Sequence, residues 1–285
     1  MSDSRLMDLE KIRRWLKEDI GQGDITSNAL IPEDVRGRAR LFTREKAVVA
    51  GIAEVRRIFE LLGCEVKTEV GQGEKVEPGE PILYVEGAAR SILSGERQAL
   101  NIFQRMTSIA TKTRTLQDEA SKVNPDVKVA ATRKTIPGLR EKDKRAVEIG
   151  GGDTHRLRLD DCVLIKDNHL TLLPSIGEAI KKAKRKVSFT KKIEVEVRCH
   201  QDALEAAKEG ADIIMYDNMS PEEIIDSMKK LDEDGLRKGR IFEASGGITE
   251  SNLKEYASTG VDIISLGSLT HSVVCLDVKL EIEMI

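Results

Sequence analysis

The chain has 285 residues, of which 40% are hydrophobic and 33% are charged, a composition that excludes a disordered protein and leaves room for one or two domains. The net charge of −3 gives no general attraction to nucleic acid or to an anionic membrane surface. No apolar run reaches the roughly 20 residues that a membrane-spanning helix needs. The N-terminal residues lack an apolar signal-peptide core and the four cysteines are far apart, so we expect reduced thiols and a cytoplasmic protein.

The first third of the chain predicts a separate α+β domain. The segments 37–51 and 64–87 contain β-branched runs typical of strands, and 53–63 between them has a helical pattern. These elements do not alternate regularly. A longer helical pattern at 95–120 would connect this part to the next one, and we therefore assign residues 1–110 to an N-terminal domain.

From about residue 125, strand and helix patterns alternate regularly. Each β-branched run ends near a polar or glycine-rich turn. A helical pattern follows each of these runs except the last one. The predicted strands are 127–133, 162–168, 192–198, 212–218, 241–247 and 262–268. Such alternation indicates βα units with a parallel sheet, and we assign residues 111–272 to this α/β domain.

The strand at 193–197 favours a barrel over an open sheet. Its apolar residues point one way, while Glu194 and Glu196 point the other way. In an open sheet both faces are covered by helices, and two carboxylates on one face would be buried without partners. A barrel interior opens toward its active site and can hold polar groups. Glu243 and Ser245 repeat the pattern two strands later.

The C-terminal residues 273–285 form a tail whose alternation allows either a strand or a helix. We expect that it packs back on the N-terminal domain.

Active sites of barrels lie at the C-terminal ends of the strands. Cations end the first strands, carboxylates the middle ones, and glycine-rich turns the last ones. The residues at these ends are Arg133, Lys134, Lys166, Glu196, Asp217, Asn218, Ser245, Gly246, Gly247, Gly267 and Ser268, and the segment before the second strand adds His155 and Arg156.

The chemistry of these groups predicts that the site binds anionic groups at two places. The cluster of cations suits a substrate with more than one carboxylate, because guanidinium binds carboxylate in a bidentate manner and ammonium adds a point charge. The glycine-rich turns after the last two strands suit a phosphate, whose oxygens accept backbone N–H groups. The residues therefore predict a site for a dianionic molecule and a sugar phosphate, the layout of a phosphoribosyl transfer.

Several roles stay open at this level. Glu196 and Asp217 either form ion pairs with the nearby cations or face a sugar, a metal ion or a cationic transition state. The role of His155 is undetermined. Arg140 lies beyond the turn that follows Lys134, where a structural ion pair is as plausible as a contact with phosphate.

The motifs resemble those of the quinolinate phosphoribosyltransferase family over nearly the whole chain, from Gly23 to Ser272. The matching segments are "GDITS", "GERQALN", "ATRKTIPGLR", "GGGDTHRLRLDD", "LIKDNH", "EVEVR", "MYDNM", "EASGGI" and "SLGSLTHS". The combination of "TRKTIPGLR", "GGGxxHR" and "IKDNH" is highly specific.

The resemblance implies a fold and a reaction. Members have an N-terminal α/β sandwich and an incomplete α/β barrel of about seven strands. They convert quinolinate and phosphoribosyl pyrophosphate, with Mg²⁺, into nicotinate mononucleotide, pyrophosphate and carbon dioxide during de novo NAD biosynthesis. The family implies a homodimer, with a higher oligomer not excluded, and no nucleic-acid or membrane partner.

The resemblance also implies a role for each motif residue. The quinolinate carboxylates would be bound by Arg133, Lys134, His155, Arg156 and Lys166, with Thr132 beside them and Arg97 reaching in from the partner subunit. Glu196 and Asp217 would contact the ribose hydroxyls and the metal. The 5′-phosphate would be bound by Ser245, Gly246, Gly247, Gly267 and Ser268. Either Lys134 or Lys166 would protonate C2 after decarboxylation.

Two other functions fit some of the same features. A nicotinate phosphoribosyltransferase would bind one carboxylate, which leaves part of the cation cluster unpaired. A non-catalytic phosphate sensor would use the glycine-rich turns, but Glu196 and Asp217 would repel its ligand.

Overall fold

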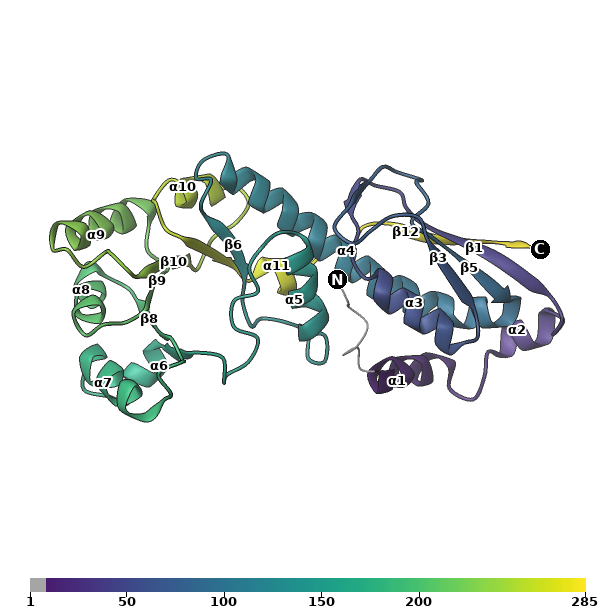
Figure 1. The fold of residues 1–285 in the computed structure, drawn as a ribbon, viewed down its shortest axis with the longest axis horizontal. Coiled ribbons are helices and arrows are strands. Elements are labelled where there is room, and N and C mark those ends of the chain that lie inside the picture. The colour runs from purple at the N-terminus through teal and green to yellow at the C-terminus, as the bar shows by residue number, and fades with distance from the viewer. Residues whose placement is uncertain (1–8) are drawn as a thin grey trace. The chain divides into compact units, whose positions relative to one another are not determined.

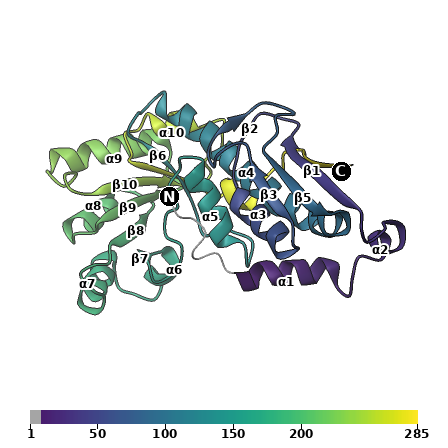
Figure 2. The ribbon, with the colours of Figure 1, turned by 45° about the vertical axis from the view of Figure 1, so that its right-hand side comes forward.

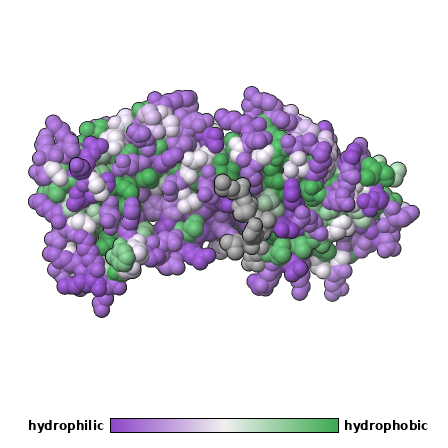
Figure 3. Space-filling view, viewed as in Figure 1, coloured by the Kyte–Doolittle hydropathy of each residue, from purple (hydrophilic) through white to green (hydrophobic). Residues whose placement is uncertain are grey.

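The computed structural model describes residues 9–285, which divide into two compact units. The first unit comprises the chain up to Lys112 together with Val273–Ile285, and the second comprises Thr113–Ser272 (Figure 1). Every helix of the described residues is too short or too polar to cross a bilayer. On the face drawn in Figure 3 hydrophilic residues predominate in both units, and apolar residues form small scattered areas.

The first unit is built on a four-stranded antiparallel sheet with the order β12-β1-β5-β3. A short antiparallel pair, β2 with β4, lies outside this sheet. The strands are β1 (Arg36–Thr43), β2 (Ala47–Val48), β3 (Glu65–Thr68), β4 (Lys75–Val76), β5 (Leu83–Ala88) and β12 (Val278–Met284). The helices are α1 (Leu9–Ile20), α2 (Ile25–Leu30), α3 (Ile52–Leu61) and α4 (Ala89–Ser121), the last of which continues into the second unit.

Alternation along the strands separates a core face from a charged face. Leu41 and Val85 are fully buried and contribute to a core that also contains Phe59 of α3 and Phe103 of α4. On the other face of the sheet, cross-strand ion pairs join Arg38 to Glu86 at 2.6 Å and Arg40 to Glu281 at 2.9 Å. These exposed pairs contribute little to stability, so the core face holds the sheet together.

The C-terminal tail forms strand β12 of the first unit. It pairs with β1 in antiparallel register from Thr43 opposite Val278 to Gly37 opposite Met284. Of the two conformations that its alternation allows, the strand is favoured because β1 has an edge with unpaired backbone groups that β12 satisfies.

The second unit contains a six-stranded parallel sheet within the described residues, with the order β6-β11-β10-β9-β8-β7. The strands are β6 (Lys128–Ala131), β7 (Val163–Ile165), β8 (Ile193–Val197), β9 (Ile213–Asp217), β10 (Ile241–Ser245) and β11 (Ile263–Leu266). The helices are α5 (Arg140–Ile149), α6 (Asp167–Leu170), α7 (Ile176–Lys186), α8 (His200–Lys208), α9 (Pro221–Glu233), α10 (Leu253–Ala257) and α11 (Ser268–His271). In Figures 1 and 2, α8 and α9 lie on the outer side of strands β8 to β10.

The strand order makes this sheet an incomplete barrel, which confirms the fold class predicted from the sequence. The last strand, β11, pairs with the first, β6, while β6 and β7 do not pair although they follow one another in the chain. The family resemblance implies about seven strands. Six form the ladder over residues 9–285, and Asp153 adds a single parallel bridge to Ala130 on the open side of β6.

Local sequence signals explain where helices of the second unit begin and end. At the start of α9, the Ser220 hydroxyl accepts the Glu223 N–H at 3.3 Å, and the Glu223 carboxylate accepts the Ser220 N–H at 2.8 Å. This reciprocal capping satisfies backbone donors that the first turn leaves unpaired, and Pro221 needs no donor at that position. Gly210 has a φ of +76°, a left-handed conformation that ends the preceding helix.

The buried core predicts a large difference between two phenylalanines. Phe59 is fully buried, whereas Phe189 is fully exposed. Phe59→Ala should lower the free energy of unfolding by about 3–5 kcal/mol, because it removes buried apolar surface and leaves a cavity. Phe189→Ala should change it by less than about 0.5 kcal/mol. Urea denaturation of both variants measures the difference, and similar losses would contradict the assigned core.

Candidate active site

A cavity of about 610 Å³ opens where the parallel strands of the second unit end. Its lining combines cations, carboxylates and a glycine-rich turn. The lining residues are Thr132, Arg133, Lys134, His155, Arg156, Leu164, Lys166, Asp167, Asn168, Glu196, Arg198, Met215, Asp217, Asn218, Glu243, Ser245, Gly246, Gly247 and Ser265. Most of the residues predicted from the strand ends therefore share one pocket.

Four cations reach this pocket from three neighbouring segments. Arg133 and Lys134 follow β6, Arg156 lies in the segment after α5, and Lys166 directly follows β7. Burial lowers the pKa of Arg133, and the charges of Arg156 and Arg140 lower it further. The cations thus repel one another, and an anion with several charged oxygens would relieve this repulsion.

The two central carboxylates are each paired with a cation in this structure. Glu196, which is mostly buried near the end of β8, forms an ion pair with Lys166. Asp217 at the end of β9 contacts Arg198 at 3.3 Å, and Arg198 also contacts Asp167 at 2.8 Å. The ion-pair alternative for these carboxylates is therefore observed, and a bound substrate would have to exchange these partners.

The turn after β10 brings its backbone against a neighbouring loop. The Asn218 N–H donates to the Ser245 carbonyl at 2.9 Å. Gly246 has a φ of +91°, and a Cβ atom at this position would lie 2.5 Å from the Asn218 side chain. Glycine is therefore required for this close approach, which places Ser245 to Gly247 at the edge of the pocket.

The turn after β11 lies beside the pocket, and Gly267 and Ser268 do not line it directly within the described part of the chain. A Cβ atom at Gly267 would come within 3.0 Å of the Lys134 side chain, so the two segments are in close contact. The Thr270 hydroxyl donates to the Lys134 carbonyl at 2.8 Å. The last strand unit therefore supports the backbone that carries the first cations.

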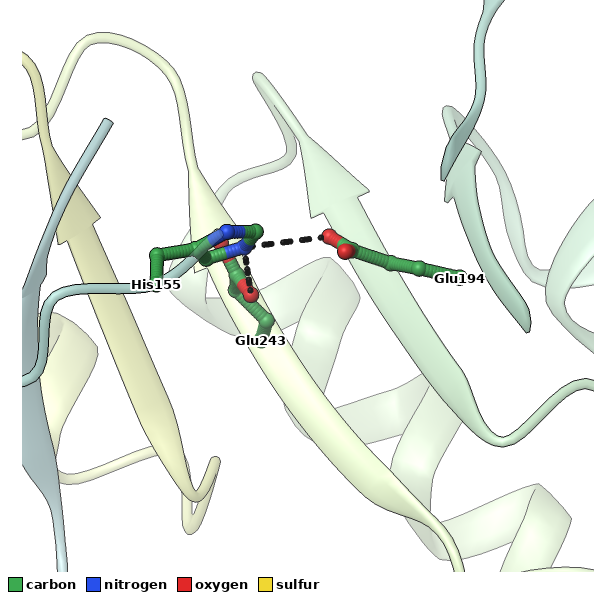
Figure 4. A group of neighbouring side chains, drawn as sticks. All are labelled: His155, Glu194 and Glu243. Carbon is green, nitrogen blue, oxygen red and sulfur yellow. Dashed lines mark hydrogen bonds and ion pairs between the residues drawn. The ribbon is translucent and has the colours of Figure 1, made fainter. Parts of the chain in front are cut away.

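His155 forms a buried cluster with two glutamates below the cations. Its Nε2 atom lies 3.4 Å from Glu194 of β8 and 3.2 Å from Glu243 of β10 (Figure 4). Both carboxylates are almost completely buried. Burial by itself lowers the pKa of His155, but the bonds to Glu194 and Glu243 outweigh it and raise this pKa to about 10.

The Nδ1 atom of His155 accepts the Arg156 backbone N–H at 2.7 Å. Nε2 therefore presents its proton to the two glutamates, and burial raises the pKa of Glu243. The three side chains place ligand atoms within 4.8 Å of one another, as a metal site would. A metal at Nε2 would move the ring proton to Nδ1, and the Arg156 bond therefore disfavours it.

The cluster forms the floor of the pocket. A second cavity of about 290 Å³ lies beneath it, lined partly by Ile213, Ile241 and Ile263 at the starts of their strands. His155 and Glu243 line both cavities. Because both ring nitrogens of His155 contact protein groups, its contact with a substrate would be through the ring edge or after a rearrangement.

Other predicted residues lie elsewhere. Arg97 is an exposed residue of α4 in the first unit and is not among those lining the pocket of the second unit. The Arg140 guanidinium donates to the Thr135 hydroxyl at 3.1 Å and to the Leu157 carbonyl at 3.4 Å, so it connects two loops rather than forming the ion pair considered from the sequence.

Sequence reasoning missed two groups of functional candidates. Asp167, Asn168 and Arg198 line the pocket, and their positions directly after β7 and β8 were the available signal. Lys144 was also missed, because it lies inside a charged helix whose polar residues suggest a solvated face. In the structure its side chain is only 1% exposed.

Lys144 is a buried cation beside other cations. Burial lowers its pKa to about 8, Asp153 opposes this change, and Arg140, Arg133 and Arg156 add to it. Between about pH 8 and 10.5 the folded chain loses this proton while the unfolded chain keeps it. Stability therefore rises with pH in this window, by at most about 1.4 kcal/mol per pH unit.

Lys144→Met should remove this contribution. Subtracting the unfolding free energy of the variant from that of the wild type should give a difference that increases from pH 8 to 10 and is constant from pH 6 to 7. Urea denaturation across this range measures it. Parallel curves for the two proteins above pH 8 would contradict the lowered pKa.

Comparison with known proteins identifies the family. Residues 24–107 match the family described as "Quinolinate phosphoribosyl transferase, N-terminal domain", and residues 109–281 match its C-terminal domain. The chain is 48% identical, over 96% of both chains, to a probable nicotinate-nucleotide pyrophosphorylase (carboxylating) of Methanocaldococcus jannaschii. It is 46% identical to the protein of the same name from Methanothermobacter thermautotrophicus, covering 98% of this chain and 99% of that one.

A solved structure agrees with these sequence matches. The crystal structure of the nicotinate-nucleotide pyrophosphorylase from Ehrlichia chaffeensis superimposes with a TM-score of 0.91 and 34% identity, covering 98% of this chain and all of that one. The fold, the pocket and these similarities lead to one conclusion: the chain belongs to the quinolinate phosphoribosyltransferase family.

Proposed function

We propose that this protein is a nicotinate-nucleotide pyrophosphorylase (carboxylating). It transfers the phosphoribosyl group of phosphoribosyl pyrophosphate to quinolinate and releases pyrophosphate and carbon dioxide, and so forms nicotinate mononucleotide for NAD biosynthesis. Membership of the family supports this activity, and the relatives at 46% and 48% identity are named probable nicotinate-nucleotide pyrophosphorylases (carboxylating).

One observation carries the proposal. The same pocket is lined by a cluster of cations, by the glycine-rich turn Ser245–Gly247, and by the carboxylates of Glu196 and Asp217. Arg133, Lys134, Arg156 and Lys166 would bind the two carboxylates of quinolinate. Ser245 to Gly247, with Gly267 and Ser268 beside them, would bind the 5′-phosphate of the second substrate. This arrangement would hold the pyridine nitrogen next to the ribose.

Glu196 and Asp217 would stabilise the transition state of transfer. The pyridine nitrogen attacks C1 of the ribose while pyrophosphate leaves, and positive charge develops on the ribose ring. Carboxylates fixed beside this charge stabilise it more strongly than they stabilise the ground state. Binding quinolinate would draw Lys166 away from Glu196 and so expose the carboxylate when it is needed.

Decarboxylation follows while the ring nitrogen is cationic. The bond between C2 and its carboxylate breaks, carbon dioxide leaves, and the electron pair stays at C2 next to the cationic nitrogen. A proton transferred to C2 completes the product. Lys134 and Lys166 both line the pocket and are the candidate donors.

The pocket fits a magnesium ion. Glu196 and Asp217 lie on neighbouring strands, and both carboxylates are oxygen ligands of the kind Mg²⁺ prefers. They would hold the ion directly or through the ribose hydroxyls. When bound, Mg²⁺ neutralises charge on the pyrophosphate.

The assembly and location belong to the same proposal. The motif "GERQALN" that contains Arg97 supports a homodimer in which Arg97 reaches the quinolinate end of the partner subunit's pocket. The widely separated cysteines support a cytoplasmic location.

Arg133→Ala should raise the KM for quinolinate by about 10- to 100-fold and lower kcat, because a charge-assisted bond to the substrate is lost. Arg185→Ala, an exposed arginine of α7, is the matched control and should leave both constants unchanged. The assay measures pyrophosphate and carbon dioxide from wild type and variants. Unchanged quinolinate kinetics in Arg133→Ala would contradict its assignment.

The same assay separates the competing functions. Wild type should release carbon dioxide and pyrophosphate with quinolinate but should not turn over nicotinate at a comparable rate, because one carboxylate leaves cations unpaired. Turnover of nicotinate alone would favour a nicotinate phosphoribosyltransferase. Binding of phosphoribosyl pyrophosphate with no pyrophosphate release from either acceptor would favour a sensor.

Glu196→Gln should lower kcat by about 100-fold or more with a smaller change in KM, since it removes a charge that acts in the transition state. Glu222→Gln, an exposed residue of α9, is the control. Steady-state kinetics with both substrates varied measure this difference. A change confined to KM would instead indicate that Glu196 binds the ground state.

Mixing two inactive variants tests the shared site. In a homodimer of Arg97→Ala every pocket lacks the arginine, and in a homodimer of Glu196→Gln every pocket lacks the carboxylate. If subunits exchange at random and each pocket takes Arg97 from the partner, about a quarter of the pockets in an equal mixture are intact. We expect activity to return to about that fraction after subunit exchange. No recovery in a mixture that forms mixed dimers would show that Arg97 does not act across the interface.

A further inference from the structure

The segment that carries Arg156 begins alongside β6. The Asp153 N–H donates to the Val129 carbonyl at 2.8 Å, and the Ala131 N–H donates to the Asp153 carbonyl at 3.0 Å. These two bonds form a short parallel ladder around the bridge between Ala130 and Asp153. The backbone that leads to Arg133 and the backbone that leads to Arg156 are therefore hydrogen-bonded neighbours up to this point.

The two backbones separate at His155. In a continuing parallel ladder, the His155 N–H would donate to the Ala131 carbonyl. His155 instead has a φ of +50°, and its N–H donates to the Asp153 side chain at 2.6 Å. The Ala131 carbonyl thereby loses its ladder donor at a buried position, where an unpaired carbonyl is costly.

Lys144 of α5 supplies the missing donor. Its Nζ atom lies 3.4 Å from the Ala131 carbonyl and also donates to the Thr154 carbonyl in a short hydrogen bond. One ammonium group thus binds both backbones where they separate. Within the sequence, Arg133 and Lys134 follow Ala131 by two and three residues, and Arg156 follows Thr154 by two.

Burying a cation at this position costs free energy, which the hydrogen bonds of the ammonium group must offset. Arg133, Arg140 and Arg156 repel it, and Asp153 attracts it. An ammonium group, however, has three donors on a flexible stem, so it can bind two carbonyls on different segments at once. The side chain of methionine has a similar length but no donor.

We propose that Lys144 is a positioning residue of the substrate pocket, which fixes the spacing between the Arg133–Lys134 segment and the His155–Arg156 segment by bonding the Ala131 and Thr154 carbonyls. The inference rests on the proposed function only in taking quinolinate as the molecule that these cations bind. Lys144 does not line the pocket and acts through the residues that do.

The proposal predicts a selective kinetic defect. Losing the ammonium group frees two carbonyls beside the quinolinate cations, whereas the Ser245–Gly247 turn follows β10 and makes no contact with Lys144 among the bonds described. Lys144→Met should raise the KM for quinolinate by about 10-fold or more, a factor equal to about 1.4 kcal/mol. The KM for phosphoribosyl pyrophosphate should stay within about twofold of wild type.

Two further variants keep the test decisive. Lys144→Gln retains donors on a shorter side chain and should recover part of the quinolinate affinity, and it carries the test if Lys144→Met does not fold. Lys184→Met is the matched control, because Lys184 also donates to a backbone carbonyl, that of Glu209 at 2.7 Å, but does not line the pocket. It should leave both KM values unchanged.

The outcomes separate the inference from the proposed function. If wild type does not convert quinolinate, the proposed function fails. If wild type is active and the Lys144 variants lose thermal stability without a change in quinolinate KM, Lys144 is only structural and the inference is overturned. An equal rise in both KM values, or a Lys144→Gln variant no better than Lys144→Met, would overturn it as well.

Discussion

The pairing of β6 with β11 is the constraint on which the pocket depends. These strands are the first and last of the barrel, and their parallel register places Ala131 opposite Leu266. The residues that follow them, Lys134 and Gly267, come into close contact as a result. If the sheet were open at this pair, the cations at the start of the domain would be separated from the glycine-rich turns at its end. The closed pair makes one site from segments more than a hundred residues apart in the sequence.

Charge inside the barrel is arranged in two layers. At the rim, Lys166 with Glu196 and Arg198 with Asp217 form partly exposed ion pairs that a charged substrate can exchange. One layer below, His155 binds two glutamates that are almost completely buried. Exposed pairs are held weakly, whereas removing one member of a buried cluster leaves an uncompensated charge. The lower layer therefore serves as a rigid floor, and the upper layer is the part that can respond to ligands.

Much of this arrangement could be predicted from periodicity. The alternation of strands and helices located each strand of the barrel, and the parity of Glu194 and Glu196 distinguished a barrel from an open sheet. The same parity did not reveal that Glu194 and Glu243 share one histidine, since they lie on strands separated by β9. Nor did it find Lys144, because helical charges look alike in a sequence whether they face solvent or a buried carbonyl. Only the tertiary structure, which shows the partners of these side chains, identifies such residues.

The sequence by itself determined the family, the order of elements and the residues at the strand ends, because these depend on local patterns and on short motifs. The tertiary structure decided the partners. Lys166 forms an ion pair with Glu196, and both ring nitrogens of His155 contact protein groups. Arg140 binds loop residues, and the C-terminal tail forms a strand of the first unit. Each of these outcomes depends on distances between residues that are remote in the chain, and chain closure through hydrogen-bonded strands sets those distances.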